Sequence, residues 1–398
     1  MKTTAIFSKL STITLILTAI FTANILMGCA AQTASVQQGD PAKSFFRDQV
    51  TYPYKVKYAD AKSNDGTVWN MGYMDVAPLF EPNPKVLVLI HGRAFSGAYF
   101  GNIVKIAHEH GIRVVVPDLP NYGKSIPGNL GNPLVRSMQQ TREVVHDLVV
   151  NHLGIPKATY GGHSLGGQFV LGYALSYPEA VEGIILIAPA GLEELPAKHF
   201  PPELAQSTHF KEFVRFPYYT RKARFDFSKS AKLIEDFFYY RLKINGKLIP
   251  MGFFKTDTPD TRLATDIRTK MITGNPVEFQ RHCITSLRDV YALGVEIKKE
   301  DPSSLFKQYD RIRAPILLIF GDEEPFYPKK ISGLKDLKKD MIKPFYRRMT
   351  GAGCPVTVKI YPGCGHFPHT DLPDQFADDA VRFVETGEAP GADDPNGF

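Results

Sequence analysis

The sequence has little of several things that would assign its class at once. Its 398 residues include only four cysteines, too few for a disulfide-stabilised scaffold. The net charge is only +6, from 47 Lys and Arg against 41 Asp and Glu, so the chain lacks the strongly basic balance of a nucleic-acid-binding protein. At 43% hydrophobic and 22% charged residues, the composition also excludes an intrinsically disordered chain. A globular protein with a sizeable core remains, and we expect no nucleic-acid partner.

Sequence motifs for common cofactors are missing as well. The stretch 118–125 contains Gly-Lys-Ser, but a phosphate-binding loop needs a glycine five residues before Gly123, and Asp118 stands there. No dinucleotide-binding glycine fingerprint opens the first strand–helix–strand unit, and no His, Cys and Asp cluster has metal-ligand spacing. We therefore expect no cofactor and no metal.

One uncharged apolar run lies at the N-terminus. Lys2 and Lys9 precede it, and it extends from Ile13 to Met27. Its length is short for a membrane-spanning helix and typical of the central part of an export signal. We predict a signal segment at 1–28; a single anchor helix is the alternative.

The end of this run, Leu26-Met27-Gly28-Cys29, resembles the lipobox of bacterial lipoproteins. That resemblance implies cleavage before Cys29 and acylation of this residue, and two or more acyl chains hold a soluble domain on a membrane stably. Because Ala30 follows, the resemblance further implies an outer-membrane anchor facing the periplasm. The polar stretch at the start of 29–49 predicts a tether.

The two cysteines nearest each other in sequence, Cys354 and Cys364, flank a strand-like run. Ten mostly extended residues separate Cα atoms by roughly 25–30 Å, whereas a disulfide tolerates only about 7 Å. We expect free thiols.

Apolar runs alternate with helix-like patterns along most of the chain. Two alternating segments predict exposed antiparallel strands, and six continuous apolar runs predict buried strands separated by helices. The antiparallel strands are expected at 51–60 and 67–76, and the buried ones at 85–92, 112–118, 157–164, 182–190, 314–321 and 357–363. This order predicts an α/β fold with a mostly parallel sheet covered by helices on both faces.

The rhythm of strands and helices is interrupted once. We expect a first core part at 50–191, a mainly helical cap insertion rich in aromatic residues at 192–313, and a second core part at 314–386. The acidic, Gly- and Pro-rich tail at 387–398 predicts disorder.

The strongest motif is Gly162-His163-Ser164-Leu165-Gly166, between a predicted strand and a predicted helix. A sharp turn at this junction holds the serine in a strained conformation and exposes its hydroxyl at the carboxyl edge of the sheet. The flanking glycines let the strand and the helix approach closely. We predict that Ser164 is a nucleophile.

With this motif in place, the chain resembles the α/β-hydrolase superfamily over about 50–191 and 314–385. Its pattern after the last predicted strand matches Gly363, Gly365, His366 and His369, which implies that His366 is the base and His369 is structural or supporting. The acid is commonly the third residue after the glycine that ends the preceding strand. That register selects Glu324, with Asp322 as the alternative.

Two N–H donors are needed to stabilise the developing oxyanion. We predict the backbone N–H of Leu165 as the first, and the resemblance implies the backbone N–H of Arg93, after His91-Gly92, as the second. The Arg93 side chain then points to solvent or meets a substrate carboxylate.

These residues predict a serine hydrolase that cleaves a carboxylic ester or related acyl bond of a small-molecule substrate through an acyl-enzyme. Acyl transfer and carbon–carbon bond hydrolysis on the same triad remain alternatives. A third is a non-catalytic envelope lipoprotein that uses the fold for binding.

Overall fold

The computed structural model describes residues 44–78, 80–126, 133–200, 242–244, 247–249 and 254–398. Its main sheet has the strand order β1-β2-β4-β3-β5-β6-β9-β10. These strands are β1 (Val56–Lys62), β2 (Val68–Val76), β3 (Val86–Ile90), β4 (Arg113–Pro117), β5 (Ala158–His163), β6 (Val181–Ile187), β9 (Ile316–Gly321) and β10 (Val356–Tyr361). β2 pairs antiparallel with β1 and β4, and the other neighbours are parallel, so the predicted fold class is confirmed.

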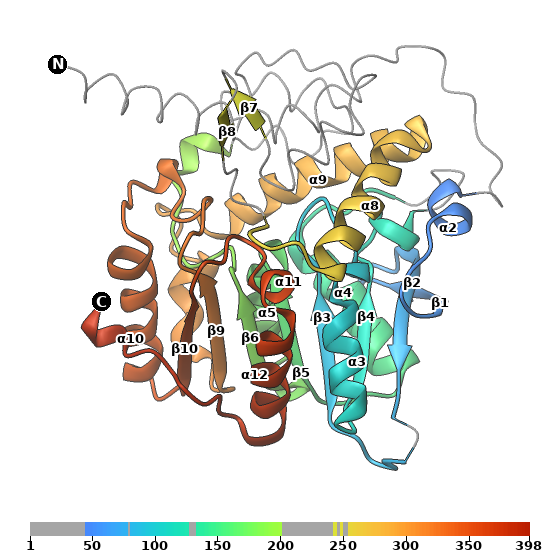
Figure 1. Cartoon of the computed structure of the whole chain (residues 1–398). Coiled ribbons are helices and arrows are strands. Elements are labelled where there is room, and N and C mark those ends of the chain that lie inside the picture. The colour runs from blue at the N-terminus through green and yellow to red at the C-terminus, as the bar shows by residue number, and fades with distance from the viewer. Residues whose placement is uncertain (1–43, 79, 127–132, 201–241, 245–246, 250–253) are drawn as a thin grey trace.

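Helices cover both faces of this sheet (Figure 1). One face packs against α3 (Gly101–Glu109) and α12 (Pro373–Thr386), and the other against α4 (Met138–His146), α5 (Leu165–Ser176) and α10 (Lys343–Gly351). The other α-helices among the described residues are α2 (Phe45–Gln49), α8 (Pro259–Thr273), α9 (Pro276–Glu296) and α11 (Pro368–Asp371). β7 (Leu242–Ile244) pairs antiparallel with β8 (Lys247–Ile249) in a separate two-stranded sheet.

The two cores follow from the alternation of side chains along each strand. In β3, Leu87 and Leu89 join the core beneath α3 and α12, while Val88 and Ile90 join the core beneath α4 and α5. All four side chains are fully buried. A strand buried on both faces has no polar side, which is why its sequence is a continuous apolar run.

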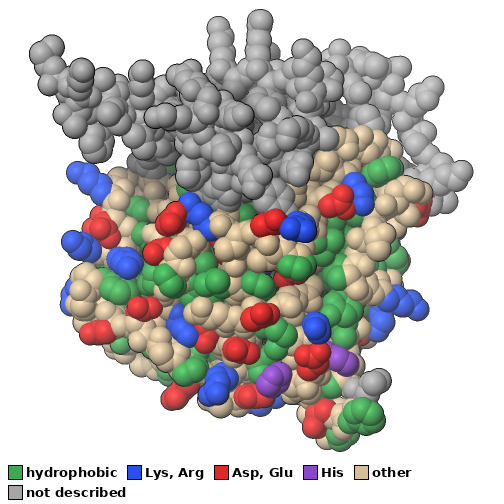
Figure 2. Space-filling model, in the orientation of Figure 1, with side chains coloured by type: hydrophobic (Ala, Val, Ile, Leu, Met, Phe, Trp, Pro, Cys, Tyr) green, Lys and Arg blue, Asp and Glu red, His purple; other side chains and the backbone are tan. Residues whose placement is uncertain are grey.

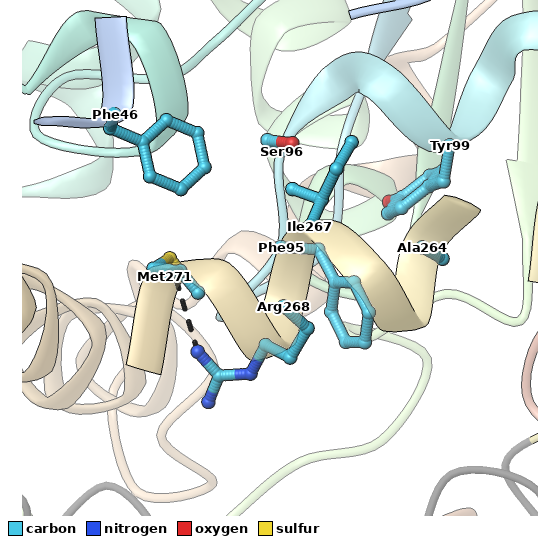
Figure 3. A pocket seen from close by; sticks show the side chains of 8 residues that line it. All are labelled: Phe46, Phe95, Ser96, Tyr99, Ala264, Ile267, Arg268 and Met271. Carbon is cyan, nitrogen blue, oxygen red and sulfur yellow. Dashed lines mark hydrogen bonds between the residues drawn. The ribbon is translucent and has the colours of Figure 1, made fainter. Parts of the chain in front are cut away.

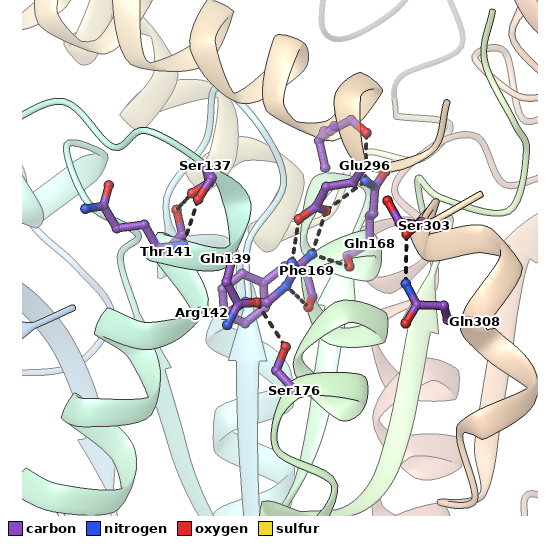
Figure 4. Close-up of polar contacts among 12 residues, drawn as sticks. Ser137, Gln139, Thr141, Arg142, Gln168, Phe169, Ser176, Glu296, Ser303 and Gln308 are labelled. Atoms are coloured by element: carbon purple, nitrogen blue, oxygen red, sulfur yellow. Dashed lines mark hydrogen bonds and ion pairs between the residues drawn. The ribbon is translucent and has the colours of Figure 1, made fainter. Parts of the chain in front are cut away.

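Helices α8 and α9 lie over the carboxyl ends of the parallel strands (Figure 1), within the stretch predicted as the cap. The C-terminal end of α9 is fixed to the core by Arg142 of α4, which forms two hydrogen bonds with Glu296 at 2.6 and 2.8 Å (Figure 4). The same guanidinium donates to the Phe169 carbonyl of α5. α9 is therefore attached to the helix that follows Ser164. Most of the aromatic run at 210–253 lies outside the described residues.

The C-terminal tail differs from its expected disorder. The Asp393 N–H donates to the Val358 carbonyl at 2.8 Å, and the Asp393 carboxylate accepts the Ile360 N–H at 2.7 Å. Both partners belong to β10, the outermost strand on its side of the sheet. The tail is ordered because these two bonds match the polar groups along that edge, which composition alone does not reveal.

The end of the predicted tether is also part of the folded domain. The Lys124 ammonium donates to the carbonyls of Phe46 and Arg47 at 2.7 Å each, at the C-terminal end of α2. At the other end of α2, the Glu278 carboxylate accepts the N–H groups of Phe45 and Phe46. The lysine of the Gly-Lys-Ser sequence thus holds a helix.

The predicted lipobox and Cys29 lie outside the described residues. None of the helices in the described ranges combines the length and hydropathy that a membrane crossing requires. Cys354 and Cys364 are buried free thiols, as predicted. On the face shown in Figure 2, acidic and basic side chains are interspersed over the described surface.

Candidate active site

The turn from β5 into α5 places Ser164 in a strained backbone conformation, with φ 54° and ψ −113°. The flanking glycines are required by space. A Cβ on Gly162 would lie 2.1 Å from the Gly166 carbonyl oxygen, and a Cβ on Gly166 would lie 2.3 Å from the Ile90 oxygen. Any larger residue would push the strand and the helix apart, so the motif imposes this turn.

Ser164 stands immediately before the first turn of α5. The N–H of Leu165 therefore belongs to the group of helix-terminal donors that have no partner within the helix. These donors and the helix dipole favour negative charge at this end. The predicted first oxyanion donor is thus beside the predicted nucleophile.

The predicted base and acid are in contact. His366 Nδ1 lies 2.8 Å from Glu324 Oε2, and the Glu324 side chain is fully buried. The other carboxylate oxygen accepts the N–H of Phe326 at 2.8 Å, which fixes the carboxylate plane. Because a carboxylate accepts, Nδ1 carries the proton, and Nε2 of the neutral ring is the nitrogen able to accept one.

The alternative acid, Asp322, has a different role. Its carboxylate accepts the N–H of Gly363 at 2.8 Å, in the turn that precedes His366. Of the two candidates, the structure brings Glu324 to the imidazole, and Asp322 ties the loop after β9 to the loop after β10.

The loop after β10 that carries His366, here called the base loop, meets the predicted nucleophile turn next to Ser164. His163 Nε2 lies 2.9 Å from the His366 carbonyl oxygen, and the centroids of the two rings are 4.9 Å apart. Ser164 and this base loop thus lie on adjoining turns, and the Ser164 side chain is in hydrogen-bond contact with Tyr327.

The loop after β3 packs directly on the nucleophile turn. A Cβ on Gly92 would lie 3.3 Å from the Ser164 Cβ, so the backbone of Gly92 touches the turn. Arg93, whose N–H is the second predicted oxyanion donor, is the next residue. The peptide that carries the second predicted donor therefore adjoins a residue packed on the turn at Ser164.

The Arg93 side chain does not extend into solvent alone. Its guanidinium donates to the Ser286 hydroxyl of α9 at 3.1 Å. Nearby, the Tyr122 hydroxyl donates to the Asp289 carboxylate of α9 at 2.7 Å, and burial raises the pKa of Asp289 to about 6. The loop after β3, here called the oxyanion loop, is thus attached to α9, a helix of the predicted cap. Arg93 and Ser286 are 193 positions apart, and a single sequence does not indicate such a contact.

A second connection to the predicted cap comes from Asp371, in α11. Its carboxylate accepts the Gly365 N–H at 3.0 Å, next to His366, and the N–H of Thr256 at 3.1 Å. Burial raises the pKa of Asp371 to about 6. The base loop and the chain leading into α8 therefore share one carboxylate.

His369 packs as a neutral aromatic ring. It lies between Tyr99 and His163, with centroid distances of 5.0 and 4.7 Å, and neither ring nitrogen has a hydrogen-bond partner. Burial, followed by the proximity of His366, lowers the pKa of His369 well below its ordinary value. Its position fits the structural role predicted for it.

A small apolar cavity lies beside the oxyanion loop (Figure 3). Phe95 and Tyr99 come from that loop and the turn after it, Ile267 and Met271 from α8, and Phe46 from α2. The cavity shows that α2, α8 and the oxyanion loop pack against one another.

Two residues of this site were not predicted from the sequence. The Tyr99 hydroxyl contacts both the Gly92 N–H and the His163 ring, and His163 contacts the base loop. His163 lies within the motif at 162–166, so the sequence could have drawn attention to it. No feature of the sequence singles out Tyr99. Among the described residues, no group of three or more His, Cys, Asp and Glu is placed to hold a metal ion.

This fold and this arrangement of Ser, His and Glu define a class, and comparison with known proteins identifies it. Residues 85–373, more than half of the chain, match the family model described as alpha/beta hydrolase fold. The chain belongs to this family.

Individual relatives are distant. The 2-hydroxy-6-oxo-6-phenylhexa-2,4-dienoate hydrolase of Comamonas testosteroni is 23% identical over 315 residues, which are 75% of this chain and 87% of that protein. An abhydrolase domain-containing protein of Caenorhabditis elegans is 31% identical over 128 residues, and the match spans only 26% of its length.

Solved structures show the same fold. A probable hydrolytic enzyme of Pseudomonas aeruginosa PAO1 has a TM-score of 0.60 at 22% identity, covering 86% of this chain and 99% of that one. An esterase of Exiguobacterium antarcticum has a TM-score of 0.54 at 16% identity, covering 83% and 100%. At these identities the likeness extends to the fold alone.

Proposed function

We propose that the protein is a serine hydrolase that cleaves a carboxylic ester or related acyl bond of a small molecule. The observation that carries this proposal is the 2.8 Å contact of buried Glu324 with His366, next to Ser164 in its strained turn. A serine hydroxyl is a weak nucleophile at neutral pH unless a positioned base removes its proton. Esterases among the structural relatives are consistent with this chemistry.

In the proposed mechanism each step is carried by a named atom. Ser164 Oγ attacks the acyl carbon and gives its proton to His366 Nε2, while Glu324 holds the Nδ1 proton and stabilises the imidazolium. The N–H groups of Leu165 and Arg93 stabilise the oxyanion. His366 then protonates the leaving alcohol, and an activated water releases the acid from the acyl-enzyme.

The test is the turnover of a short chromogenic ester by Ser164→Ala. We expect loss of turnover and of labelling by a fluorophosphonate probe, with the thermal transition retained. Ser176→Ala is the matched control, because this serine ends the same helix and its hydroxyl contacts Gln139 far from the turn. Persistent turnover in Ser164→Ala would refute the assignment.

The same assay separates the alternatives. The relative from Comamonas testosteroni is named as a 2-hydroxy-6-oxo-6-phenylhexa-2,4-dienoate hydrolase, so that dienoate should be included with the ester panel. Turnover of the dienoate without ester turnover would move the proposal to carbon–carbon hydrolysis on the same triad. Formation of a new ester with an added alcohol would identify acyl transfer. If the fluorophosphonate probe does not label the wild-type protein, a binding protein is favoured.

We further propose that the mature chain is anchored in the bacterial outer membrane, facing the periplasm, through acylated Cys29. The lipobox-like sequence supports this proposal. An alkynyl fatty acid should label the wild type and Cys354→Ala but not Cys29→Ala, which should move to the soluble fraction. Equal labelling of all three would contradict the proposal.

A further inference from the structure

Three loops of the site meet through a chain of hydrogen bonds. The Gly92 N–H contacts the Tyr99 hydroxyl, which lies 2.9 Å from His163 Nδ1. His163 Nε2 lies 2.9 Å from the carbonyl oxygen of His366. The chain thus begins in the oxyanion loop, passes through the nucleophile motif and ends in the base loop.

The direction of every proton in this chain is determined. A carbonyl oxygen can only accept, so His163 Nε2 carries the ring proton and donates it to His366. His163 Nδ1 is then an acceptor, and the Tyr99 hydroxyl must donate to it. The peptide N–H of Gly92 can only donate, and the Tyr99 oxygen accepts it. Both ends of the chain impose the same polarity.

Burial keeps this arrangement in one protonation state. Tyr99 and His163 are each only 1% exposed. Burial, followed by the proximity of His369 and His366, lowers the pKa of His163 well below its ordinary value, so the ring is neutral. A second proton would have to sit on Nδ1, where the Tyr99 hydroxyl already points its own.

The carbonyl side of Gly92 is held as well. His91 Nδ1 donates to the Gly92 carbonyl at 2.8 Å, while His91 Nε2 accepts the N–H of Leu119 at 3.0 Å. This carbonyl belongs to the peptide whose N–H is that of Arg93. In a trans peptide the C=O and N–H point in opposite directions, so fixing the carbonyl aims the N–H.

We propose that Tyr99 and His163 are positioning residues of the hydrolytic site, which hold the oxyanion loop and the base loop in register with Ser164. The inference rests on the proposed serine-hydrolase function. Both act through the backbone of Gly92 and His366. The consequence is an oxyanion hole that is assembled before substrate arrives, because no bond in the chain has to be made or reversed.

The first test compares two tyrosines that lose only a hydroxyl. Tyr99→Phe leaves the Gly92 N–H without its acceptor and His163 Nδ1 without its donor. Tyr173→Phe is the matched control, because its buried hydroxyl also contacts a histidine Nδ1, that of His146 at 2.8 Å, in the core behind the sheet. For a short chromogenic ester we expect roughly 10–100-fold lower kcat in Tyr99→Phe with KM changed less than about threefold, and near wild-type kcat in Tyr173→Phe.

The second test does not depend on activity. In the full chain labelled with ¹⁵N-histidine, the resonances of His163 are assigned by their loss in His163→Gln. We expect the neutral tautomer protonated on Nε2, and a change of the Nδ1 resonance in Tyr99→Phe but not in Tyr173→Phe. A His163 protonated on Nδ1, or equal kcat in the two tyrosine variants, would overturn the proposal. Ester turnover by Ser164→Ala would instead refute the proposed function and leave the tautomer result to stand.

Discussion

The two sides of the candidate site are held together by different chemistry. One side, here called the floor, consists of the strand-end loops at 91–99, 163–165, 322–327 and 363–367. The other, the roof, consists of α8 and α9. Within the floor, the oxyanion loop, the turn at Ser164 and the loop carrying His366 are joined to one another by neutral groups, with Tyr99, His91 and His163 bonded to backbone. The roof is joined to the core by ionisable side chains, among them Asp289 and Glu296.

This difference predicts that the contacts of the floor and those of the roof respond differently to pH. The floor's neutral bonds have a single polarity, so they change little over the pH range in which the protein is folded. The roof's contacts include carboxylates whose pKa burial raises to about 6, such as Asp289, and Asp371 joins the base loop to the chain that leads into α8. We therefore expect the neutral bonds of the floor to maintain the geometry of the site, and the carboxylates of the roof to make its contacts depend on pH.

The largest expected effect is on the floor. Glu324→Gln removes the charge that stabilises the imidazolium and can place an amide N–H against His366 Nδ1, which favours the wrong tautomer. We expect kcat for a short ester to fall by roughly 10²–10⁴-fold. Asp322→Asn is the control, because its oxygen can still accept the Gly363 N–H. A larger loss in Asp322→Asn would reassign the acid.

The next effect concerns the roof and is a loss of stability. Arg142 is buried and bonded to Glu296, so Arg142→Met leaves a carboxylate without its partner at the end of α9. We expect the free energy of unfolding in urea to fall by about 3–5 kcal/mol. Lys57→Met removes an exposed partner of Asp75 and should cost less than about 1 kcal/mol. Equal losses would show that α9 is not held by this ion pair.

A smaller effect is a pH dependence carried by Asp289. Burial raises its pKa to about 6. At pH values between the pKa of an unfolded aspartate and about 6, the folded protein therefore binds more protons than the unfolded protein does. This residue's contribution to stability therefore falls as pH rises through that window and is constant above it. Relative to Asp289→Asn, the wild type should lose about 2 kcal/mol between pH 4.5 and 8. Parallel unfolding curves for the two proteins would contradict the burial of this charge.

The smallest effect tests the bond between roof and floor. Ser286→Ala removes one acceptor of the Arg93 guanidinium but leaves the Arg93 backbone in place. One neutral partner contributes about 1 kcal/mol, so kcat should fall by roughly two- to fivefold. Ser176→Ala should have no such effect. A drop as large as that of Tyr99→Phe would show that the roof, rather than the neutral chain, positions the oxyanion hole.

Local rules were sufficient to predict the fold and the contact of Glu324 with His366. Continuous apolar runs such as 86–90 locate strands that are buried on both faces. Steric demand at Gly162 and Gly166 locates the nucleophile turn, and the register after β9 selects Glu324. These are properties of a few consecutive residues, so one sequence contains them.

The contacts that join distant segments could not be predicted in the same way. Arg93 meets Ser286 across 193 positions, and Lys124 meets the backbone of α2 across about 75. A long polar side chain has the same composition whether it meets solvent, substrate or another helix. Only the packed geometry decides among them, as it also did for the ordered tail.

The ordered tail bears on the solubility of the protein. β10 is the last strand on its side of the sheet, and an uncovered edge strand is a template for pairing with another molecule. Asp393 occupies the N–H of Ile360 and the carbonyl of Val358, so that edge is already taken. The opposite edge, β1, instead carries Lys57, Asp60 and Lys62. Charged side chains thus protect the β1 edge from pairing with another molecule, and the C-terminal tail protects the β10 edge. A protein shortened after Thr386 should therefore aggregate through β10.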